Sequence, residues 1–373
     1  MVLSDTEKIN SLRLIMTDNI GPVTYNQLLS YYGTATKAIM HLPELAKSGG
    51  RIKNLKLVSE SDAERQFELA QKKQVRILFR QDADYPSRLQ QISDIAPVLF
   101  VKGDISVFQK KAVSVVGTRN ASLNGKALAR QISSDLAKAG YNIVSGLAHG
   151  IDRAAHVGAL SVGKGNTTAV LGTSVDEVYP QTNQDVYDQI ADNGCLVSEF
   201  PFLTPMNPRN FPRRNRVIAA LSEGTLVIEA QERSGSLITA REAANFGREV
   251  LAVPGSPVDP RSSGPNALIR DGATLVSSAQ DVITALEALN TFSLRQEAAV
   301  PAVDCEPLDE DTLTDARTLV YHNLGTEPVS VDFLIQETGL EARAVNVILA
   351  ELAIAGRLER YPGNRVSLVY SVE

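Results

Sequence analysis

Four arginines surround an aromatic residue in the stretch 200–240, FPFLTPMNPRNFPRRNRVIAALSEGTLVIEAQERSGSLITA. The cluster contains Arg209, Phe211, Arg213, Arg214, Asn215 and Arg216. Arginine makes bidentate, charge-assisted hydrogen bonds to phosphate, and an aromatic face beside cations can stack on the bases of a single strand. The stretch therefore predicts a phosphate-containing ligand such as single-stranded DNA. Some of these arginines could instead form structural ion pairs with Glu199 or Glu229.

Three glycine-containing turns follow predicted strands and open predicted helices. They contain Gly117, Thr118, Arg119 and Asn120; Ser145, Gly146 and Gly150; and Ser234, Gly235 and Ser236. Free N–H groups at a helix N-terminus favour an anion. Each turn alone also fits a plainly capped helix, but three turns on one sheet edge favour a phosphate site. Asp152 is expected to be a helix cap, and His156 a packed or hydrogen-bonded histidine.

Several signatures of enzymes are absent from the sequence. It contains no dinucleotide fingerprint, P-loop, nucleophile elbow or paired-carboxylate signature, which argues against NAD, ATPase and esterase chemistry. We expect a binding protein without a cofactor, not an enzyme. The alternative is a nucleotide-processing enzyme, because Glu223-Gly224-Thr225 followed by Glu229 is faintly similar to the G-G-x-G-T-x-x-E loop of phosphoribohydrolases. The leading Pro-Gly-Gly of that loop is missing.

Composition indicates a cytoplasmic protein of two or three domains. The 373 residues exceed one ordinary domain, and no apolar run reaches the roughly 18 residues of a membrane helix. Cys195, Cys305 and four histidines are far apart and lack ligand spacing, so no metal site is expected. Two lone cysteines suit a reducing compartment, and Cys195 is expected in the core.

Short apolar runs alternate with helical patterns from residue 112 onward. The runs AVSVVG, NIVSG, TTAVLG, CLVSEF, GTLVIEA and EVLAVPG predict strands. Such a series predicts an α/β fold with a Rossmann-like doubly wound, mostly parallel sheet over residues 81–290. Ligands of these sheets bind outside the carboxyl ends of the strands, where the three glycine-containing turns collect.

Two further domains are predicted on either side of the sheet. Residues 1–80 are a helical, SAM-like or helix-hairpin-helix-like domain, whose turn at Gly21 is more easily explained by packing than by DNA contact. Residues 291–310 are predicted as a linker, and residues 311–373 as a winged-helix domain. Residues 310–373 carry 5 basic and 10 acidic residues. The predicted recognition helix, 341–355, is therefore expected to pack or bind a partner instead of reading the major groove.

Six sequence phrases between residues 84 and 273 together resemble the DNA-processing protein A family (DprA, also called Smf). They are DYP, VVGTRNAS, VSGLAHGIDRAAHVGAL, FPRRNRVIAALS, VIEAQERSGSLITAREAANFGREVLAVPG and NALIRDGA. The helical N-terminal part resembles the family's SAM-like domain, and the C-terminal part resembles its optional winged-helix domain.

The resemblance implies a function and assigns two residues. It implies binding of single-stranded DNA, dimerisation through the Rossmann-like domain, and loading of the RecA recombinase during natural transformation. No membrane partner is expected. Arg119 corresponds to the family's DNA-binding arginine in the G-[ST]-R loop, and Phe211 to the aromatic residue before the R-N-R run. The family's DNA-contacting lysine falls on Pro208 in this sequence, and we hypothesise that Arg209 substitutes for it.

Overall fold

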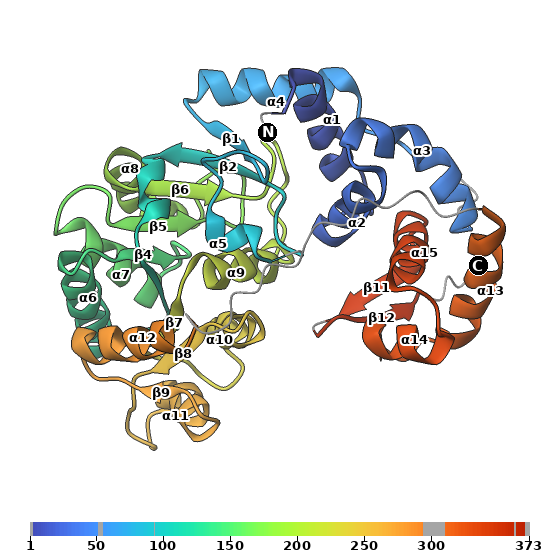
Figure 1. Ribbon diagram of the computed structural model, residues 1–373. Coiled ribbons are helices and arrows are strands. Elements are labelled where there is room, and N and C mark those ends of the chain that lie inside the picture. Colours follow the sequence, from blue (N-terminus) through green and yellow to red (C-terminus); the bar gives the residue numbers. More distant parts are fainter. Residues whose placement is uncertain (1–2, 51–54, 93, 294–309, 362, 370–373) are drawn as a thin grey trace. The chain divides into compact units, whose positions relative to one another are not determined.

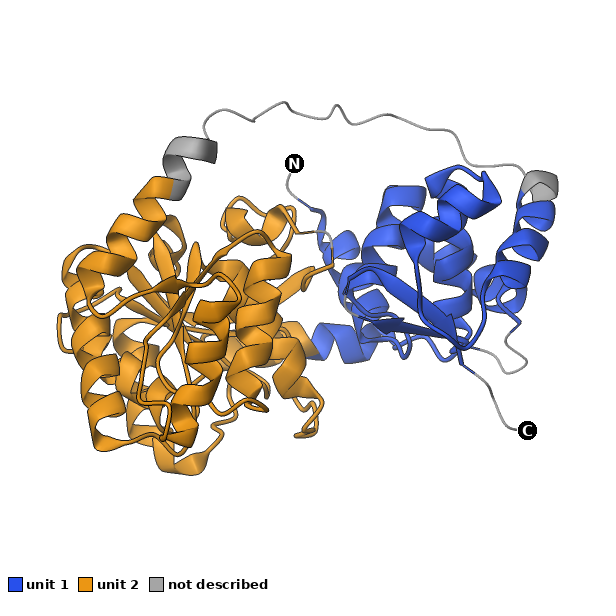
Figure 2. Ribbon diagram, turned by 90° about the horizontal axis from the view of Figure 1, so that it is seen from below, with its two compact units in different colours: residues 1–65, 300–373 blue, residues 66–299 orange. Residues whose placement is uncertain are grey.

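The computed structural model describes residues 3–50, 55–92, 94–293, 310–361 and 363–369. The chain forms two compact units, residues 1–65 with 300–373, and residues 66–299 (Figure 2). Most of the predicted linker, together with Cys305, lies outside the described residues. Within the described residues, no helix combines the length and the apolar character needed to cross a membrane.

The larger unit is built on a nine-stranded sheet with the order β1-β2-β6-β5-β4-β3-β7-β8-β9 (Figure 1). The strands are β1 (Arg76–Phe79), β2 (Val98–Gly103), β3 (Ala112–Val116), β4 (Asn142–Ser145), β5 (Thr167–Val170), β6 (Cys195–Ser198), β7 (Gly224–Val227), β8 (Glu249–Ala252) and β9 (Thr274–Leu275). Strand β2 is antiparallel to both neighbours, and the pairings from β6 through β9 are parallel. The predicted α/β fold with a mostly parallel sheet is confirmed.

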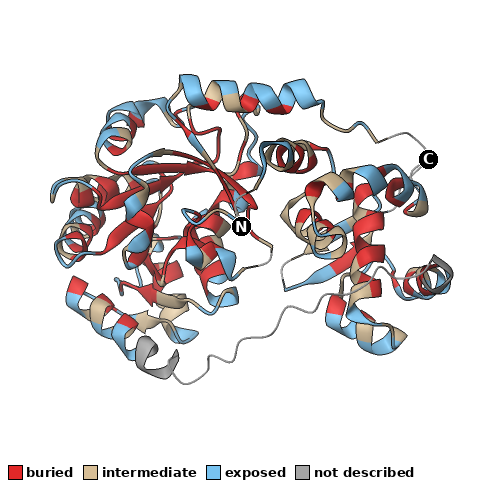
Figure 3. Ribbon diagram, turned by 45° about the horizontal axis from the view of Figure 1, so that its top comes forward, coloured by how far each residue is buried: buried red, intermediate tan, exposed pale blue. Residues whose placement is uncertain are grey.

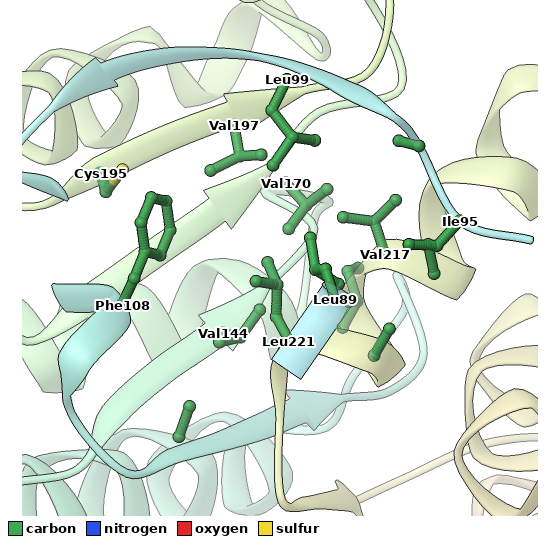
Figure 4. Packing of buried hydrophobic residues seen from close by; sticks show 14 of the residues in the cluster. Leu89, Ile95, Leu99, Phe108, Val144, Val170, Cys195, Val197, Val217 and Leu221 are labelled. Atoms are coloured by element: carbon green, nitrogen blue, oxygen red, sulfur yellow. The ribbon is translucent and has the colours of Figure 1, made fainter. Parts of the chain in front are cut away.

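Helices cover both faces of this sheet. Alternate side chains of a strand point to opposite faces, so each buried strand packs against helices on both sides. Val113 and Val115 pack on the side of α6 (Leu123–Lys138), α7 (Ile151–Leu160) and α12 (Ala279–Ser293). On the other side, Val144, Val170 and Val197 pack against α5 (Ser87–Gln90) and α9 (Asn210–Leu221), as Figure 4 shows. The strands are consequently buried on both faces (Figure 3), which explains their continuous apolar runs.

The order of the strands reverses direction next to β3. The chain moves from β3 through β4 and β5 to β6 on one side, and β7, β8 and β9 extend the sheet on the other side. In open α/β sheets, a crevice that binds ligands lies at the carboxyl ends of strands where the order reverses. The turns at 117–122 and 228–234 follow β3 and β7 and therefore flank this point. The remaining helices of this unit are α8 (Gln184–Asn193), α10 (Gly235–Asn245) and α11 (Ser263–Arg270).

The smaller unit combines the two ends of the chain. Its first part contains α1 (Asp5–Met16), α2 (Pro22–Tyr32) and α3 (Ala35–Ser48), and α4 (Glu60–Lys72) leads into the larger unit. Its second part is a winged helix with α13 (Glu310–Asn323), α14 (Val331–Thr338), α15 (Ala342–Ile354), and the strands β10 (Val329–Ser330), β11 (Leu358–Tyr361) and β12 (Arg365–Leu368). The sheet order is β10-β12-β11. The predicted winged-helix fold is confirmed.

The recognition helix α15 packs against the N-terminal helices. Ile354 is part of the hydrophobic core of α1, α2 and α3, and Gln27 Nε2 donates to Asn346 Oδ1 at 3.1 Å. A side chain on Gly49 would overlap the backbone carbonyl of Glu351, so glycine allows α3 and α15 to approach closely. The helix thus packs within the protein. Packing is one of the two roles expected for it from the sequence; binding of a partner is the other.

Candidate nucleic-acid interface

Phe211 lies at the centre of a cluster of aromatic and cationic side chains. It sits in the first turn of α9, where a proline-rich loop ends, and its ring is half-buried. Its ring centroid is 5.4 Å from that of Tyr179, and the guanidinium carbon of the exposed Arg119 lies 5.6 Å from it. A Cβ at Gly172 would overlap the ring. The fold therefore brings together the two residues that the family resemblance assigns, Arg119 and Phe211.

Tyr179 is a residue of this cluster that the sequence reasoning missed. It lies in the loop between β5 and α8 and is 36% exposed, so part of its ring is available to a ligand. The detectable signal was an aromatic residue that follows a predicted strand at the same sheet edge as the three glycine-containing turns. Together Tyr179 and Phe211 provide two adjacent aromatic surfaces for stacking.

Arg214 is buried beneath Phe211. Its side chain donates hydrogen bonds to the carbonyl oxygens of Gly146 and Val170, and to Asn215 Oδ1 at 3.1 Å. Its guanidinium carbon is 5.8 Å from the Phe211 ring centroid. Burial lowers the pKa of Arg214 to about 10, with Asp152 acting in the opposite direction, so the group stays charged at neutral pH. Arg214 ties α9 to the ends of β4 and β5 and supports Phe211 from below.

The other three arginines differ in how far they are engaged. Arg213 Nη2 is 3.3 Å from Glu199 Oε2, which is one of the ion pairs predicted from the sequence. Arg216 forms ion pairs with Asp94 and, at 3.4 Å, with Glu242. Arg209 is exposed and has no ion pair within the described ranges of the chain. Arg209 therefore remains available to an anion, as the hypothesis that it substitutes for the family's lysine requires.

Internal groups occupy two of the three predicted phosphate cradles. Glu229 accepts hydrogen bonds from Ser122 N at 2.9 Å and Ser122 Oγ at 2.5 Å, at the N-terminus of α6. The N–H group of Thr118 donates to the Glu229 carbonyl at 2.6 Å, and that of Asn120 to Thr118 Oγ1 at 3.2 Å. Both carboxylate oxygens of Glu229, the candidate catalytic residue of the phosphoribohydrolase-like alternative, bond to Ser122.

The turn before α7 is filled in the same way. The Asp152 carboxylate accepts from Gly146 N at 3.2 Å and from Ala148 N at 3.4 Å, while burial raises its pKa and Arg214 lowers it. Ser145 is buried and donates to the Val115 carbonyl at 2.6 Å. Gly150, with φ +76°, lies where a Cβ would overlap the Thr118 carbonyl. These glycines allow the protein's own loops to approach closely, and direct contact of Ser145, Gly146 and Gly150 with DNA stays a prediction.

The turn before α10 differs from the other two. Ser234 caps the helix by accepting from Ser236 N at 3.4 Å, and the two hydroxyl oxygens are 2.7 Å apart. Gly235 is exposed, and its carbonyl accepts from Asn215 Nδ2 at 3.1 Å. Asn215 therefore links α9 to the one predicted cradle at which no carboxylate bond is observed among the described residues.

Three family models match the chain. That of DNA recombination-mediator protein A matches residues 76–287, that of the DprA-like N-terminal HHH domain residues 5–69, and that of the DprA winged helix domain residues 306–364. The chain belongs to the DNA recombination-mediator protein A family. This family member is 38% identical to Protein Smf of Escherichia coli over 285 residues, 76% of this chain and 75% of the relative. It is 44% identical to DNA processing protein DprA of Streptococcus pneumoniae over 207 residues, 55% of this chain and 72% of the relative.

Two solved structures of DprA proteins resemble this family member. The structure of DNA processing protein A from Streptococcus pneumoniae has a TM-score of 0.64 and 33% identity, and the match covers 76% of this chain and 98% of the other. The structure that describes the single-stranded DNA binding mode of DNA processing protein A from Helicobacter pylori has a TM-score of 0.52 and 29% identity, and this match covers 58% of this chain and 96% of the other. This chain therefore shares the fold of these relatives, and the matches support a role in DNA processing.

Other titratable groups of this DprA-family protein lie in the core. His156 is fully buried, its Nδ1 is 2.8 Å from Thr167 Oγ1, and burial together with Arg214 lowers its pKa to about 3. The prediction of a packed, hydrogen-bonded histidine is confirmed. Cys195 is also buried, and burial raises the pKa of its thiol. Among the described residues, no group of three or more histidine, cysteine or acidic side chains has an arrangement that could hold a metal ion.

Proposed function

We propose that this DprA-family protein binds single-stranded DNA at the surface around Phe211, and that it acts as a recombination mediator and not as an enzyme. The observation that carries the proposal is the meeting of Arg119, Tyr179 and Phe211 at the carboxyl edge of the sheet. Each base stacked on an aromatic ring contributes about 1–3 kcal/mol without preference for sequence. The single-stranded DNA binding mode described for the Helicobacter pylori relative agrees with this choice of ligand.

The residues of the proposed site have different roles. Phe211 and Tyr179 stack on bases, and Arg119 forms a bidentate contact to a phosphate. Arg209 takes the place of the family's lysine, which Pro208 replaces, and contacts a second phosphate. Arg214 does not reach the strand and instead positions Phe211 from below.

The N-terminus of α10 is a further phosphate contact in this proposal. The positive end of a helix and its free N–H groups favour an anion, and Gly235 is exposed there. The contact involves Ser234, Gly235 and Ser236. Asn215 donates a hydrogen bond to the Gly235 carbonyl and so holds this turn against α9.

The family resemblance supports three further parts of the proposal. The bound strand is loaded with the RecA recombinase during natural transformation, the protein works in the cytoplasm, and it forms a homodimer through the Rossmann-like domain.

The test is fluorescence anisotropy with matched single- and double-stranded oligonucleotides over a salt series. We expect preference for the single strand, and a log–log salt slope of about −0.7 per phosphate neutralised. Arg119→Ala should weaken single-strand binding and make that slope shallower by about 0.7. Arg130→Ala is the matched control, because Arg130 is an exposed cation of α6. Equal affinity for both forms of DNA, or no effect of Arg119→Ala, would refute the proposed site.

A further inference from the structure

A cavity with three lysines in its lining adjoins the loop that carries Tyr179, and the proposed function does not use it. Its volume is about 700 Å³, and it is lined by the end of α4, by β2, by the loop after β5, by α8 and by Leu203. Three lysines, Lys72, Lys73 and Lys102, line this cavity. We call it the lysine basin.

Two loops connect the lysine basin with the Phe211 site. Val178 lines the basin, and the next residue, Tyr179, lies against Phe211. Leu203 also lines the basin, and its loop continues to the start of α9 and so to Phe211. Met206 in this second loop is 47% exposed, and Arg209 follows it. Each of the two loops therefore has one part at the Phe211 site and another part at the basin.

The basin offers cations that are not already neutralised. Lys73 Nζ is 2.9 Å from Asp176 Oδ2, so this pair is internally compensated. Within the described residues, Lys72 and Lys102 have no ion pair, and Glu177 is an exposed acid of the lining. Lys72 and Lys102, without an ion pair in the described part of the chain, provide contacts for two phosphates of a polyanion.

Leu203 presents an apolar surface to solvent from a strained backbone. It is 66% exposed and has φ +66°, a left-handed conformation that costs a residue other than glycine roughly 1–2 kcal/mol. The conformation is held on both sides: Phe202 N donates to Gln66 Oε1 at 2.8 Å, and Thr204 Oγ1 donates to the Pro201 carbonyl at 2.7 Å. Backbone strain that the surroundings maintain is concentrated at ligand sites, and an exposed leucine there can contact an unstacked base.

We propose that the lysine basin is a second subsite for single-stranded DNA. Lys72 and Lys102 hold phosphates of the strand that continues past Phe211, and Leu203 contacts one of its bases. The inference rests on the proposed function, because it requires that the strand binds at Phe211 first. It predicts that affinity rises again when an oligonucleotide becomes long enough to reach the basin.

The test is a length series of oligothymidylates, measured by anisotropy on the full chain. The double variant Lys72→Ala/Lys102→Ala should bind the shortest oligonucleotides as the wild type does. Beyond a threshold length it should bind about 20-fold more weakly at about 0.1 M salt, with a salt slope shallower by about 1.4. The control Arg130→Ala/Lys138→Ala removes two exposed cations of α6 and should change neither value.

A second variant addresses the apolar contact. Leu203→Gly removes the side chain and permits the left-handed conformation, so the loop should keep its shape. We expect weaker binding of long oligonucleotides only. No loss at any length, or an equal loss at every length, would overturn the second subsite. The proposed function fails separately, if Arg119→Ala leaves the binding of the shortest oligonucleotides unchanged.

Discussion

Phe211 and Arg214 lie within one turn of α9 and have different surroundings. The ring of Phe211 is half-buried beside Tyr179 and Arg119, whereas Arg214 is 5% exposed and donates to two backbone carbonyls. Residues three positions apart are neighbours on the surface of a helix, so Arg214 can support Phe211 from the same face of α9. A charge at this helix is therefore not by itself a DNA contact.

Removing the aromatic ring at the centre of the site should reduce affinity strongly. We expect Phe211→Ala to weaken single-strand binding by about 1–3 kcal/mol, since this is the measured worth of one stacked base. Phe333→Ala is the control, because Phe333 is 54% exposed on α14 of the other unit. Anisotropy with one labelled oligonucleotide measures both variants. An unchanged affinity for Phe211→Ala would remove stacking from the mechanism.

His156 should make stability dependent on pH. Its folded pKa is about 3, below the ordinary 6.5, because the buried imidazole stays neutral. The unfolded chain takes up this proton below about pH 6.5, so stability is fully present above that pH and is lost as the pH falls towards 3. Between pH 6.5 and 5.0, wild type should lose about 2 kcal/mol more than His156→Gln. Urea unfolding followed by circular dichroism at both pH values measures this difference, and parallel losses would contradict it.

At the scale of elements, the strands were predictable from the sequence and α9 was not. The strands of the parallel sheet are continuous apolar runs because both faces are covered. The sequence FPRRNR indicates a run of cations, whereas in the structure it is the first part of a helix. The helix turns Arg214 into the interior and Arg216 towards Asp94 and Glu242. Those two partners come from distant parts of the chain, and no local pattern indicates them.

The sequence pattern does not indicate the internal carboxylates either. Glu229 bonds to Ser122 N and Asp152 bonds to Gly146 N, in or next to turns whose sequence predicts phosphate cradles. A glycine-containing turn before a helix has the same sequence pattern whether an external anion or an internal carboxylate satisfies it. Arg119 was predicted as a ligand contact from its turn and the resemblance, and the fold brings it to Phe211. The contribution of Tyr179 depends on the path of the long β5–α8 loop, which local patterns do not determine.

The contact between α3 and α15 should be sensitive to side-chain volume. Gly49→Leu places atoms where the Glu351 carbonyl lies, and such overpacking costs about 1–3 kcal/mol. We expect faster hydrogen–deuterium exchange in α3 and α15, with the strands of the large sheet unchanged. Gly21→Ala is the control, because a Cβ at Gly21 meets no atom within 4 Å. Unchanged exchange in α15 would contradict the close packing of the two helices.

At the scale of the molecule, the larger unit should be stable by itself and should carry the DNA binding. The larger unit has its own cores on both faces of the sheet, and all proposed DNA contacts lie within it. In the smaller unit, the recognition helix is engaged by α2 and α3, and acidic residues outnumber basic ones in the winged-helix segment. Neither feature favours insertion of α15 into a major groove.

A chain of residues 66–293 should therefore bind single strands as the full chain does, with the same salt slope. This truncation also tests the turn at Gly21, which begins α2 and has the form of a helix-hairpin-helix turn. If that turn held one phosphate of the strand, the truncated chain would show a slope shallower by about 0.7. An equal slope assigns the turn to packing, whereas a shallower slope adds the smaller unit to the DNA-binding surface. Because the slope counts neutralised phosphates, it separates a lost contact from a merely less stable protein.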